Sequence, residues 1–249
     1  MLFRSSSKTL IITEGATDWR HIKAAIHALS QIKSTKALCE MLDIEFLEFD
    51  HKNSNESGSL IKLEMCNTTL CRMCEEYAKI KQQRKLIFIA DRDDKDTNKK
   101  LGGECAYKKW GNNVYSVILP IPAHRKTTPD ICIEHYYSDD EIKTPVIING
   151  ISRRLYMVNE FDAHGRCLDM PVICEKKKIC GPDKIGIIEG SQGEKVLSTT
   201  PGKDDNLALS KMQFAIKVLN KEPPFSDFNF GAFKELLMII NDINQLPLE

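Results

Sequence analysis

The sequence lacks any apolar run near the roughly 20 residues that a bilayer-spanning helix needs. It also lacks an excess of charge, because its 249 residues carry a formal net charge of +0. The first absence argues against a membrane protein. The second means that no field of one sign steers the whole molecule towards nucleic acid, so such contacts must come from local basic clusters.

The 9 cysteines form no disulfide framework. An odd number of scattered cysteines is typical of reduced thiols that serve as small apolar side chains. Cys66, Cys71 and Cys74 have the spacing of half a zinc site, but no second half follows in a recognised pattern. The first residues, MLFRSSSKTLIITEG, contain an apolar stretch too short for a secretory signal. We therefore expect a cytoplasmic protein.

Strand and helix patterns alternate along the first half of the chain. Short apolar runs predict strands at 8–13, 44–49, 85–90 and 113–120, and helical patterns cover 22–29 and 60–80. This alternation implies crossover connections and a mainly parallel sheet flanked by helices. We therefore expect an α/β, Rossmann-like core over residues 1–128.

The second half of the sequence has a different character. We expect a short helix near 131–137, hairpin strands around 151–158, and closing helices at about 205–220 and 230–243. Residues 129–249 are therefore predicted to form an α+β C-terminal extension. We expect this extension to contribute residues to the active site of the core.

Acidic side chains follow two of the predicted strands. Glu14 comes directly after the first strand and Asp18 about one helical turn later, while Asp91 and Asp93 follow the third strand. The carboxyl ends of parallel strands gather functional groups at one edge of a sheet. Crowded carboxylates repel one another unless a divalent cation neutralises them, so this cluster predicts bound Mg²⁺ or Mn²⁺.

Each acidic motif alone has a simpler interpretation. Aspartate and glutamate are common in turns and at helix N-caps, and DRDDKD on its own fits a solvated loop equally well. The two motifs together, in the order that a single cluster needs, favour a metal site. In an extended segment Asp91 and Asp93 point the same way, and Arg92 faces elsewhere.

The segments Glu14-Gly15-Ala16-Thr17-Asp18 and Asp91-Arg92-Asp93, each at the end of a strand, resemble the motifs of the Toprim domain. Primases, topoisomerases and OLD-family nucleases share this domain. The resemblance covers about the first half of the chain, and the interval between the motifs is longer than in the minimal domain. It implies a Mg²⁺- or Mn²⁺-dependent nuclease with two ions, held by Glu14, Asp18, Asp91 and Asp93, that cuts phosphodiester bonds of DNA or RNA.

The OLD-like nucleases add a late carboxylate and a late lysine. The matching positions here are Glu134 in ICIEHYY, as a metal ligand, and Lys211 in LALSKMQFA, as a catalytic cation. Cys132 stands where that family has a preceding carboxylate, with Asp130 as a substitute. A lysine on the surface of a helix is an equally good account of Lys211.

Basic clusters offer contacts for the substrate backbone. We name Arg153, Arg154, Lys176 and Lys177 as substrate-binding candidates, although such clusters are more often solvated faces. The resemblance is nearest to the standalone Toprim proteins of antiphage defence systems, which stand beside a separate ATPase or reverse transcriptase. The chain has no phosphate-binding glycine loop of the P-loop type, so ATP hydrolysis would belong to such a partner.

Two other functions stay open. A metal-dependent glycosyltransferase also places Asp-x-Asp after a strand, but it does not require Glu14 or Asp18 at the end of another strand. A non-catalytic Toprim module could instead serve as an interaction subunit of a larger complex. An intact set of carboxylates argues against this second function.

Overall fold

The structure is a computed structural model that describes residues 6–51, 60–190, 193–202 and 205–249. The chain divides into two compact units, which are described separately. The first unit contains residues 1–133 and 230–249, and the second contains residues 134–229. The C-terminal segment from Phe230 thus belongs with the first unit, whereas the sequence prediction had placed it in the extension.

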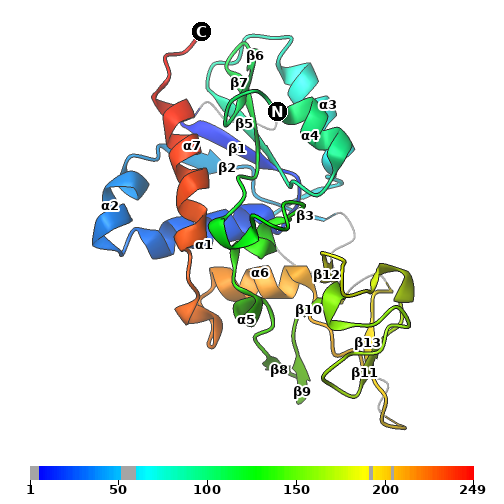
Figure 1. The fold of residues 1–249 in the computed structure, drawn as a ribbon. Helices are drawn as coiled ribbons and strands as arrows, with labels where there is room; N and C mark the ends of the chain where they lie inside the picture. The colour runs from blue at the N-terminus through cyan, green and yellow to red at the C-terminus, as the bar shows by residue number, and fades with distance from the viewer. Residues whose placement is uncertain (1–5, 52–59, 191–192, 203–204) are drawn as a thin grey trace. The chain divides into compact units, whose positions relative to one another are not determined.

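A five-stranded sheet forms the centre of the first unit, in the order β2-β1-β5-β7-β6 (Figure 1). Its first four strands are parallel, and β6 runs antiparallel at one edge. Every residue of the three central strands is buried, as the short apolar runs predicted. The strands are β1 (Thr9–Thr13), β2 (Ile44–Phe46), β5 (Leu86–Ala90), β6 (Lys108–Gly111) and β7 (Val114–Ile118).

Helices flank this sheet in two groups (Figure 1). One group, α3 (Asn67–Tyr77) and α4 (Lys95–Leu101), packs together and against β7. In the other, α1 (Asp18–Leu29) contacts β1 and α2 (Lys33–Glu40), and α2 contacts α7 (Lys234–Gln245). The mixed α/β architecture with a mainly parallel sheet agrees with the predicted fold class.

The helix α7 is held to the amino-terminal ends of two strands by polar contacts. The Thr9 hydroxyl donates to the Asn244 side-chain oxygen at 2.6 Å, and the Lys85 ammonium donates to the Asn244 backbone carbonyl at 2.7 Å. One face of α7 is also buried through Leu236, Leu237, Ile240 and Ile243. These contacts explain why the last twenty residues join the first unit.

The predicted bounds of two elements in the first unit are wrong. The run at 44–49 is split into β2 and β3 (Phe49–His51), because the chain leaves the main sheet after Leu47 and β3 pairs instead with β4 (Ile61–Leu63). The predicted helix over 60–80 therefore begins only at Asn67, after an extended Cys66. The residues between these two elements, 52–59, lie outside the described part of the chain.

The second unit has little regular structure. It opens with a 3-10 turn, η2 (Ile133–Tyr136), whose first residue belongs to the first unit. The helix α5 (Asp139–Ile142) follows, and after it the strands β8 (Val146–Ile148) and β9 (Ile151–Arg153) form a hairpin. Asn149 and Gly150 turn this hairpin with φ values of 53° and 78°, as a type I′ turn requires. The remaining strands are β10 (Tyr156–Met157), β11 (Val172–Cys174), β12 (Ile187–Ile188) and β13 (Val196–Ser198), and the remaining helix is α6 (Lys211–Leu219).

Two small cores stabilise the second unit. In one, the Phe214 ring of α6 packs edge to face with Tyr137 and Phe225, and Phe228 packs against these rings at a tilt. The other surrounds Phe161 and the paired strands β10–β12 and β11–β13, and it includes the buried thiols Cys174 and Cys180. All nine cysteines are free, and six of them are buried as the predicted use as apolar side chains requires, whereas Cys66 and Cys105 are exposed.

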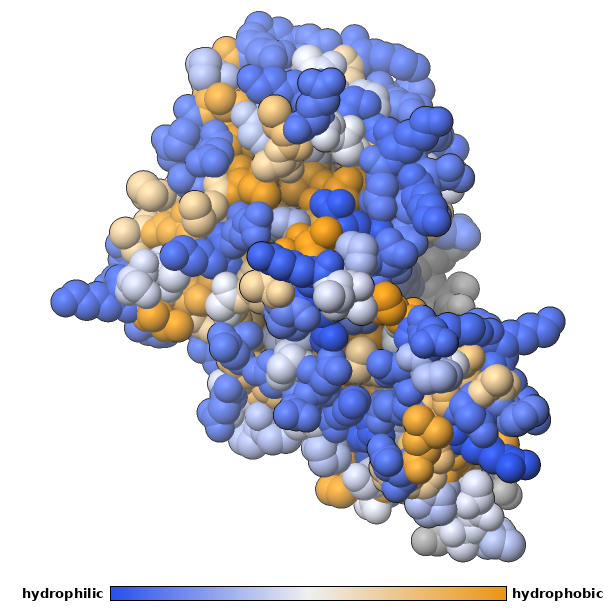
Figure 2. All heavy atoms as spheres, in the orientation of Figure 1, coloured by the Kyte–Doolittle hydropathy of each residue, from blue (hydrophilic) through white to orange (hydrophobic). Residues whose placement is uncertain are grey.

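Short 3-10 turns complete the chain: η1 (Ala123–Arg125), η3 (Val158–Glu160), η4 (Lys177–Ile179), η5 (Phe225–Asp227) and η6 (Gly231–Phe233). Within the described residues, no helix is both long and apolar enough to cross a membrane. On the face seen in Figure 2, hydrophilic side chains predominate and hydrophobic ones gather in separate patches.

Candidate active site

Glu14 occupies the position directly beyond β1, at the carboxyl edge of the sheet. Its backbone N–H donates to the Ile89 carbonyl of β5 at 3.1 Å, which extends the pairing of the two strands by one residue. Its half-buried carboxylate accepts a hydrogen bond from the backbone N–H of Asp91. The two acidic motifs, 77 positions apart in sequence, therefore meet where these neighbouring strands end.

Asp18 closes the first motif into a tight turn. As the first residue of α1 it is only 5% exposed, and its carboxylate accepts hydrogen bonds from the Gly15 N–H at 2.7 Å and the Thr17 hydroxyl at 3.1 Å. A Cβ atom at Gly15 would lie 2.8 Å from the Asp18 carboxylate, which is closer than such atoms approach. The spacing Glu-Gly-x-x-Asp therefore matches this turn, in which the Asp18 carboxylate reaches back to the Gly15 N–H and leaves no room for a side chain at Gly15.

The second motif sends its side chains in different directions. Asp91 accepts a hydrogen bond from the Ile133 N–H at 3.1 Å, whereas the Arg92 Nε donates to the Leu119 carbonyl beyond β7 at 2.7 Å. Asp93 is exposed. Asp94, which the sequence analysis did not single out, caps α4 by accepting from the Thr97 N–H at 2.7 Å. The spacing Asp-x-x-Thr before a helical run was the available signal for this cap.

Burial, together with the neighbouring carboxylates, raises the pKa of Glu14 to about 8. Burial is the main cause, because it penalises the charged form, and the negative charges of Asp18, Asp93 and Asp94 raise the pKa further. The hydrogen bond from the Asp91 N–H opposes the shift. A perturbed carboxyl at the carboxyl edge of a parallel sheet is characteristic of functional sites.

The donor set of this cluster fits a hard divalent cation. Glu14, Asp18, Asp91 and Asp93 offer carboxylate oxygens alone, which Mg²⁺ and Mn²⁺ prefer over the nitrogen and sulfur ligands typical of zinc. In the part of the chain that the structure describes, no three acidic, histidine or cysteine side chains already form a complete set of metal ligands.

Removing the charge of Glu14 should stabilise the metal-free protein at high pH. Folding raises the pKa of this carboxyl from 4.5 to about 8, so ionisation opposes folding increasingly between these values and fully above pH 8. Glu14→Gln should therefore unfold several degrees higher than the wild type at pH 8.5, and the difference should vanish near pH 4.5. Thermal unfolding in chelator at several pH values measures this, and a constant difference would contradict the assignment.

Glu134 and Lys211, the two residues carried over from the OLD-like nucleases, form an ion pair within the second unit. The Lys211 Nζ lies 3.0 Å from the Glu134 Oε2, with side chains 23% and 1% exposed. Lys211 is the first residue of α6, directly after the N-cap Ser210. The lysine is therefore not a freely solvated surface residue, and it contacts the carboxylate that the resemblance implies as a metal ligand.

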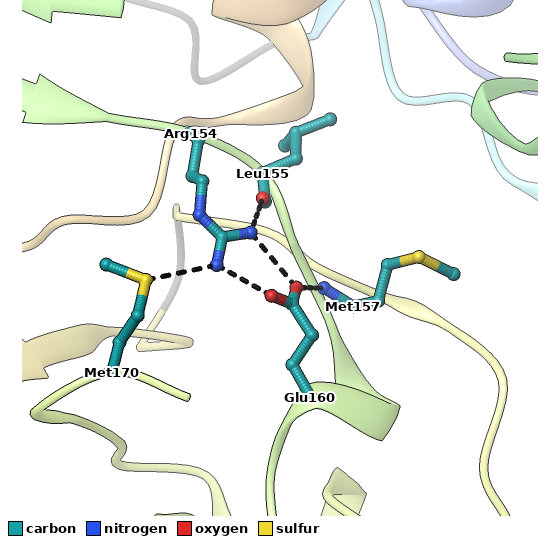
Figure 3. Close-up of polar contacts among 5 residues, drawn as sticks. All are labelled: Arg154, Leu155, Met157, Glu160 and Met170. Atoms are coloured by element: carbon teal, nitrogen blue, oxygen red, sulfur yellow. Dashed lines mark hydrogen bonds and ion pairs between the residues drawn. The ribbon is translucent and has the colours of Figure 1, made fainter. Parts of the chain in front are cut away.

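Arg154 is already engaged by its own unit (Figure 3). Its guanidinium forms two hydrogen bonds with the Glu160 carboxylate, at 3.1 and 2.6 Å, and a third with the Leu155 carbonyl. It also lies 3.8 Å from the centre of the Tyr156 ring. Both members of the pair are almost buried, at 13% and 12% exposure. A substrate phosphate would have to displace Glu160 to reach Arg154.

The other three substrate-binding candidates also lie in the second unit. Arg153, on β9, is half-buried, and its Nε is buried without a hydrogen-bond partner among the described residues. Lys176 pairs with Glu194, and both Lys176 and Lys177 are exposed. A role for these three in contacting phosphate stays a prediction.

Breaking the Arg154–Glu160 pair should destabilise the second unit. Glu160→Ala leaves a nearly buried guanidinium without its counter-charge, and we expect a loss of about 3 kcal/mol in the free energy of unfolding. The control is Lys176→Ala, which breaks an exposed ion pair and should leave the free energy of unfolding nearly unchanged. Urea unfolding of both variants measures the difference, and equal small losses would contradict a structural role for Arg154.

Comparison of the chain with models of protein families, with curated proteins and with solved structures gives no match. The functional assignment therefore depends on the chemistry of the residues themselves.

Proposed function

We propose that this chain is a Mg²⁺- or Mn²⁺-dependent nuclease of the Toprim type, which hydrolyses phosphodiester bonds of DNA or RNA. The observation that carries the proposal is the meeting of Glu14 with the Asp91–Asp93 segment at the carboxyl edge of a parallel sheet. A glycosyltransferase that relies on Asp-x-Asp alone would have no use for Glu14 or Asp18 at this place. A non-catalytic module would gain nothing from a cluster of carboxylates that opposes folding when ionised.

In this proposal the carboxylates of Glu14, Asp18, Asp91 and Asp93 would hold two divalent ions, with Glu134 as the further ligand that the resemblance implies. Bound there, the ions would supply charge neutralisation at the scissile phosphate and activation of water. Lys211 neutralises negative charge that develops on the phosphorus centre. Arg92, tied to the carbonyl of Leu119, keeps its charge out of the metal site while the aspartates on either side of it contribute theirs.

The test uses the full-length chain with plasmid DNA, single-stranded DNA and cellular RNA in Mg²⁺ or Mn²⁺, each with and without chelator. We expect cleavage of at least one substrate that chelator abolishes. Binding of Mn²⁺ is measured separately by the paramagnetic signal of the free ion. Absence of both cleavage and Mn²⁺ binding would overturn the proposal, whereas Mn²⁺ binding without cleavage would favour an effector that a partner ATPase or reverse transcriptase activates.

A further inference from the structure

A cavity of about 590 Å³ opens in the first unit on the Arg92 side of the acidic loop. Its walls come from α4, the loop that joins α4 to β6, the end of β7, and α7. In Figure 2 hydrophobic side chains are visible in the part of the first unit between α4 and α7 of Figure 1. The volume lies within the roughly 300–1,000 Å³ of typical ligand sites.

The lining combines apolar walls with a few polar groups of opposite hydrogen-bonding type. Ile118 and Ile239, each 7% exposed, contribute apolar surface, and the half-buried Tyr107 adds an aromatic ring held edge to face against Tyr115. Arg92 supplies donors and Glu235 supplies acceptors. Such a lining suits a planar ligand with polar edges better than a lipid or a bare phosphate.

Asn98, which also lines the cavity, has a side-chain oxygen that accepts no hydrogen bond from any described residue. Its side-chain nitrogen donates to the Arg92 carbonyl at 2.7 Å, which fixes the amide with its oxygen on the other side. That oxygen is buried and has no hydrogen-bond partner among the described residues. A buried acceptor without a donor costs free energy, so a ligand that brings an N–H group to the cavity would satisfy it.

Arg92 also has hydrogen-bond donors that no described residue uses. Its Nε donates to the Leu119 carbonyl, and its terminal nitrogens have no hydrogen bond or ion pair with another described residue. The guanidinium is thereby anchored at one edge and free to form two parallel hydrogen bonds at the other. Since Arg92 stands between Asp91 and Asp93 in the chain, a ligand held here lies beside the proposed metal site.

We propose that this cavity binds an unpaired guanine base. Guanine presents the acceptors O6 and N7, which an arginine fork contacts in pairs. Its N1–H and N2–H₂ groups are adjacent donors, which match the carboxylate of Glu235 and the oxygen of Asn98. Adenine, cytosine and the uracil or thymine ring each lack one of these two paired edges. In a duplex the N1–H and N2–H₂ groups are occupied by the paired cytosine, and only the O6/N7 edge is open to a protein. Contact with both edges therefore requires a guanine from a single strand.

The consequence for the substrate rests on the proposed nuclease function. A guanine held beside the metal site would place a neighbouring phosphodiester at the carboxylates. We therefore expect the enzyme to prefer single-stranded nucleic acid and to cut close to an unpaired guanine.

Binding is tested without metal, by protection of a cysteine. Cys105 is exposed and belongs to the cavity lining, whereas Cys66 is exposed and lies outside it. The full-length protein is treated with iodoacetamide in chelator, with or without GMP, AMP, CMP or UMP, and mass spectrometry reports the alkylation of each cysteine. GMP should slow alkylation of Cys105 at least threefold, with Cys66 unaffected. Equal protection by all four nucleotides, or none by GMP, would overturn the proposal.

A matched pair of variants on α7 tests the contribution of Glu235. Glu235→Gln replaces an acceptor in the cavity, and Asp242→Asn makes the same chemical change on an exposed part of the helix outside it. We expect the concentration of GMP that gives half-maximal protection to rise about tenfold in Glu235→Gln and to stay unchanged in Asp242→Asn. Equal behaviour of the two variants would exclude recognition through Glu235.

Different results would contradict the nuclease proposal and the guanine-binding proposal. If the chain is not a nuclease, GMP still protects Cys105 in chelator, although no substrate is cut. If the cavity does not bind guanine, metal-dependent cleavage persists, but replacing every guanine in a single-stranded substrate by adenine leaves its rate unchanged. Loss of cleavage on that replacement, with retention on a guanine-containing control strand, supports the cavity as the site of substrate selection.

Discussion

Asp93→Asn should lower the rate of metal-dependent cleavage at least about a hundredfold, while the protein keeps its fold. The substitution keeps the size of the side chain and removes one negative charge from the cluster around Glu14, where that charge raises the pKa of the glutamate. An amide is a poor ligand for Mg²⁺ in place of a carboxylate. The loss should therefore appear in metal binding and in cleavage together.

Asp93 is a better choice for this test than Asp91. Asp93 is exposed, whereas Asp91 accepts a hydrogen bond from the backbone of Ile133. A variant at Asp91 would mix the loss of a metal ligand with the loss of this contact. At Asp93 the metal-free protein should be as stable as the wild type or more so, because repulsion among the carboxylates is relieved.

The matched control is Asp96→Asn, which makes the same chemical change at an exposed position in the first turn of α4. It should retain full cleavage activity. Initial rates on the best substrate of the wild type, together with Mn²⁺ binding and thermal unfolding, separate the outcomes. If Asp93→Asn cleaves as fast as Asp96→Asn, the aspartate loop is only a solvated turn with a helix cap, and the proposed metal site is wrong.

The sheet of the first unit could be predicted because its signals are local. Buried parallel strands are short apolar runs, and in this chain the runs that became β1, β5 and β7 stand clearly between polar stretches. The meeting of Glu14 with Asp91 follows from the same pattern, since parallel strands place their carboxyl ends at one edge.

The features that the sequence did not predict depend on contacts between residues that are far apart in the chain. The segment around 60–66 has an apolar pattern compatible with a helix, yet Ile61–Leu63 pairs with β3 and delays α3 to Asn67. The cavity beside Arg92 combines α4 with Glu235 of α7, more than one hundred residues away. No local signal in the sequence connects these residues. The ion pair between Glu134 and Lys211 was likewise approached only through a family resemblance.

Replacement of Lys211 is the second change with a large expected effect. Lys211→Met keeps most of the apolar stem and removes the charge that faces Glu134. A lysine at the first position of a helix opposes the helix dipole, so this location favours a role other than helix stability. If the lysine neutralises charge at the phosphorus centre, the cleavage rate at saturating substrate should fall about a hundredfold or more, with little change in substrate or metal binding.

The same variant also disturbs folding, and the two effects must be separated. Glu134 is 1% exposed, so loss of its partner leaves a buried carboxylate. We expect a cost of about 2 kcal/mol, below the usual value for fully buried pairs because Lys211 is partly exposed. The double variant Glu134→Gln/Lys211→Met removes both charges and should recover most of this stability.

Cleavage by the double variant then decides whether the pair belongs to the catalytic site. If Lys211 acts on the substrate or Glu134 binds metal, the double variant folds as well as the wild type by urea unfolding but remains at least about a hundredfold slower. Cleavage by the single variant Glu134→Gln, which keeps the lysine, separates these two roles. If Lys211 serves only to neutralise Glu134, cleavage returns together with stability. Recovery of the rate would remove both residues from the catalytic set, because a required metal ligand at Glu134 could not be replaced by glutamine without loss. The acidic cluster of the first unit would then carry the chemistry alone.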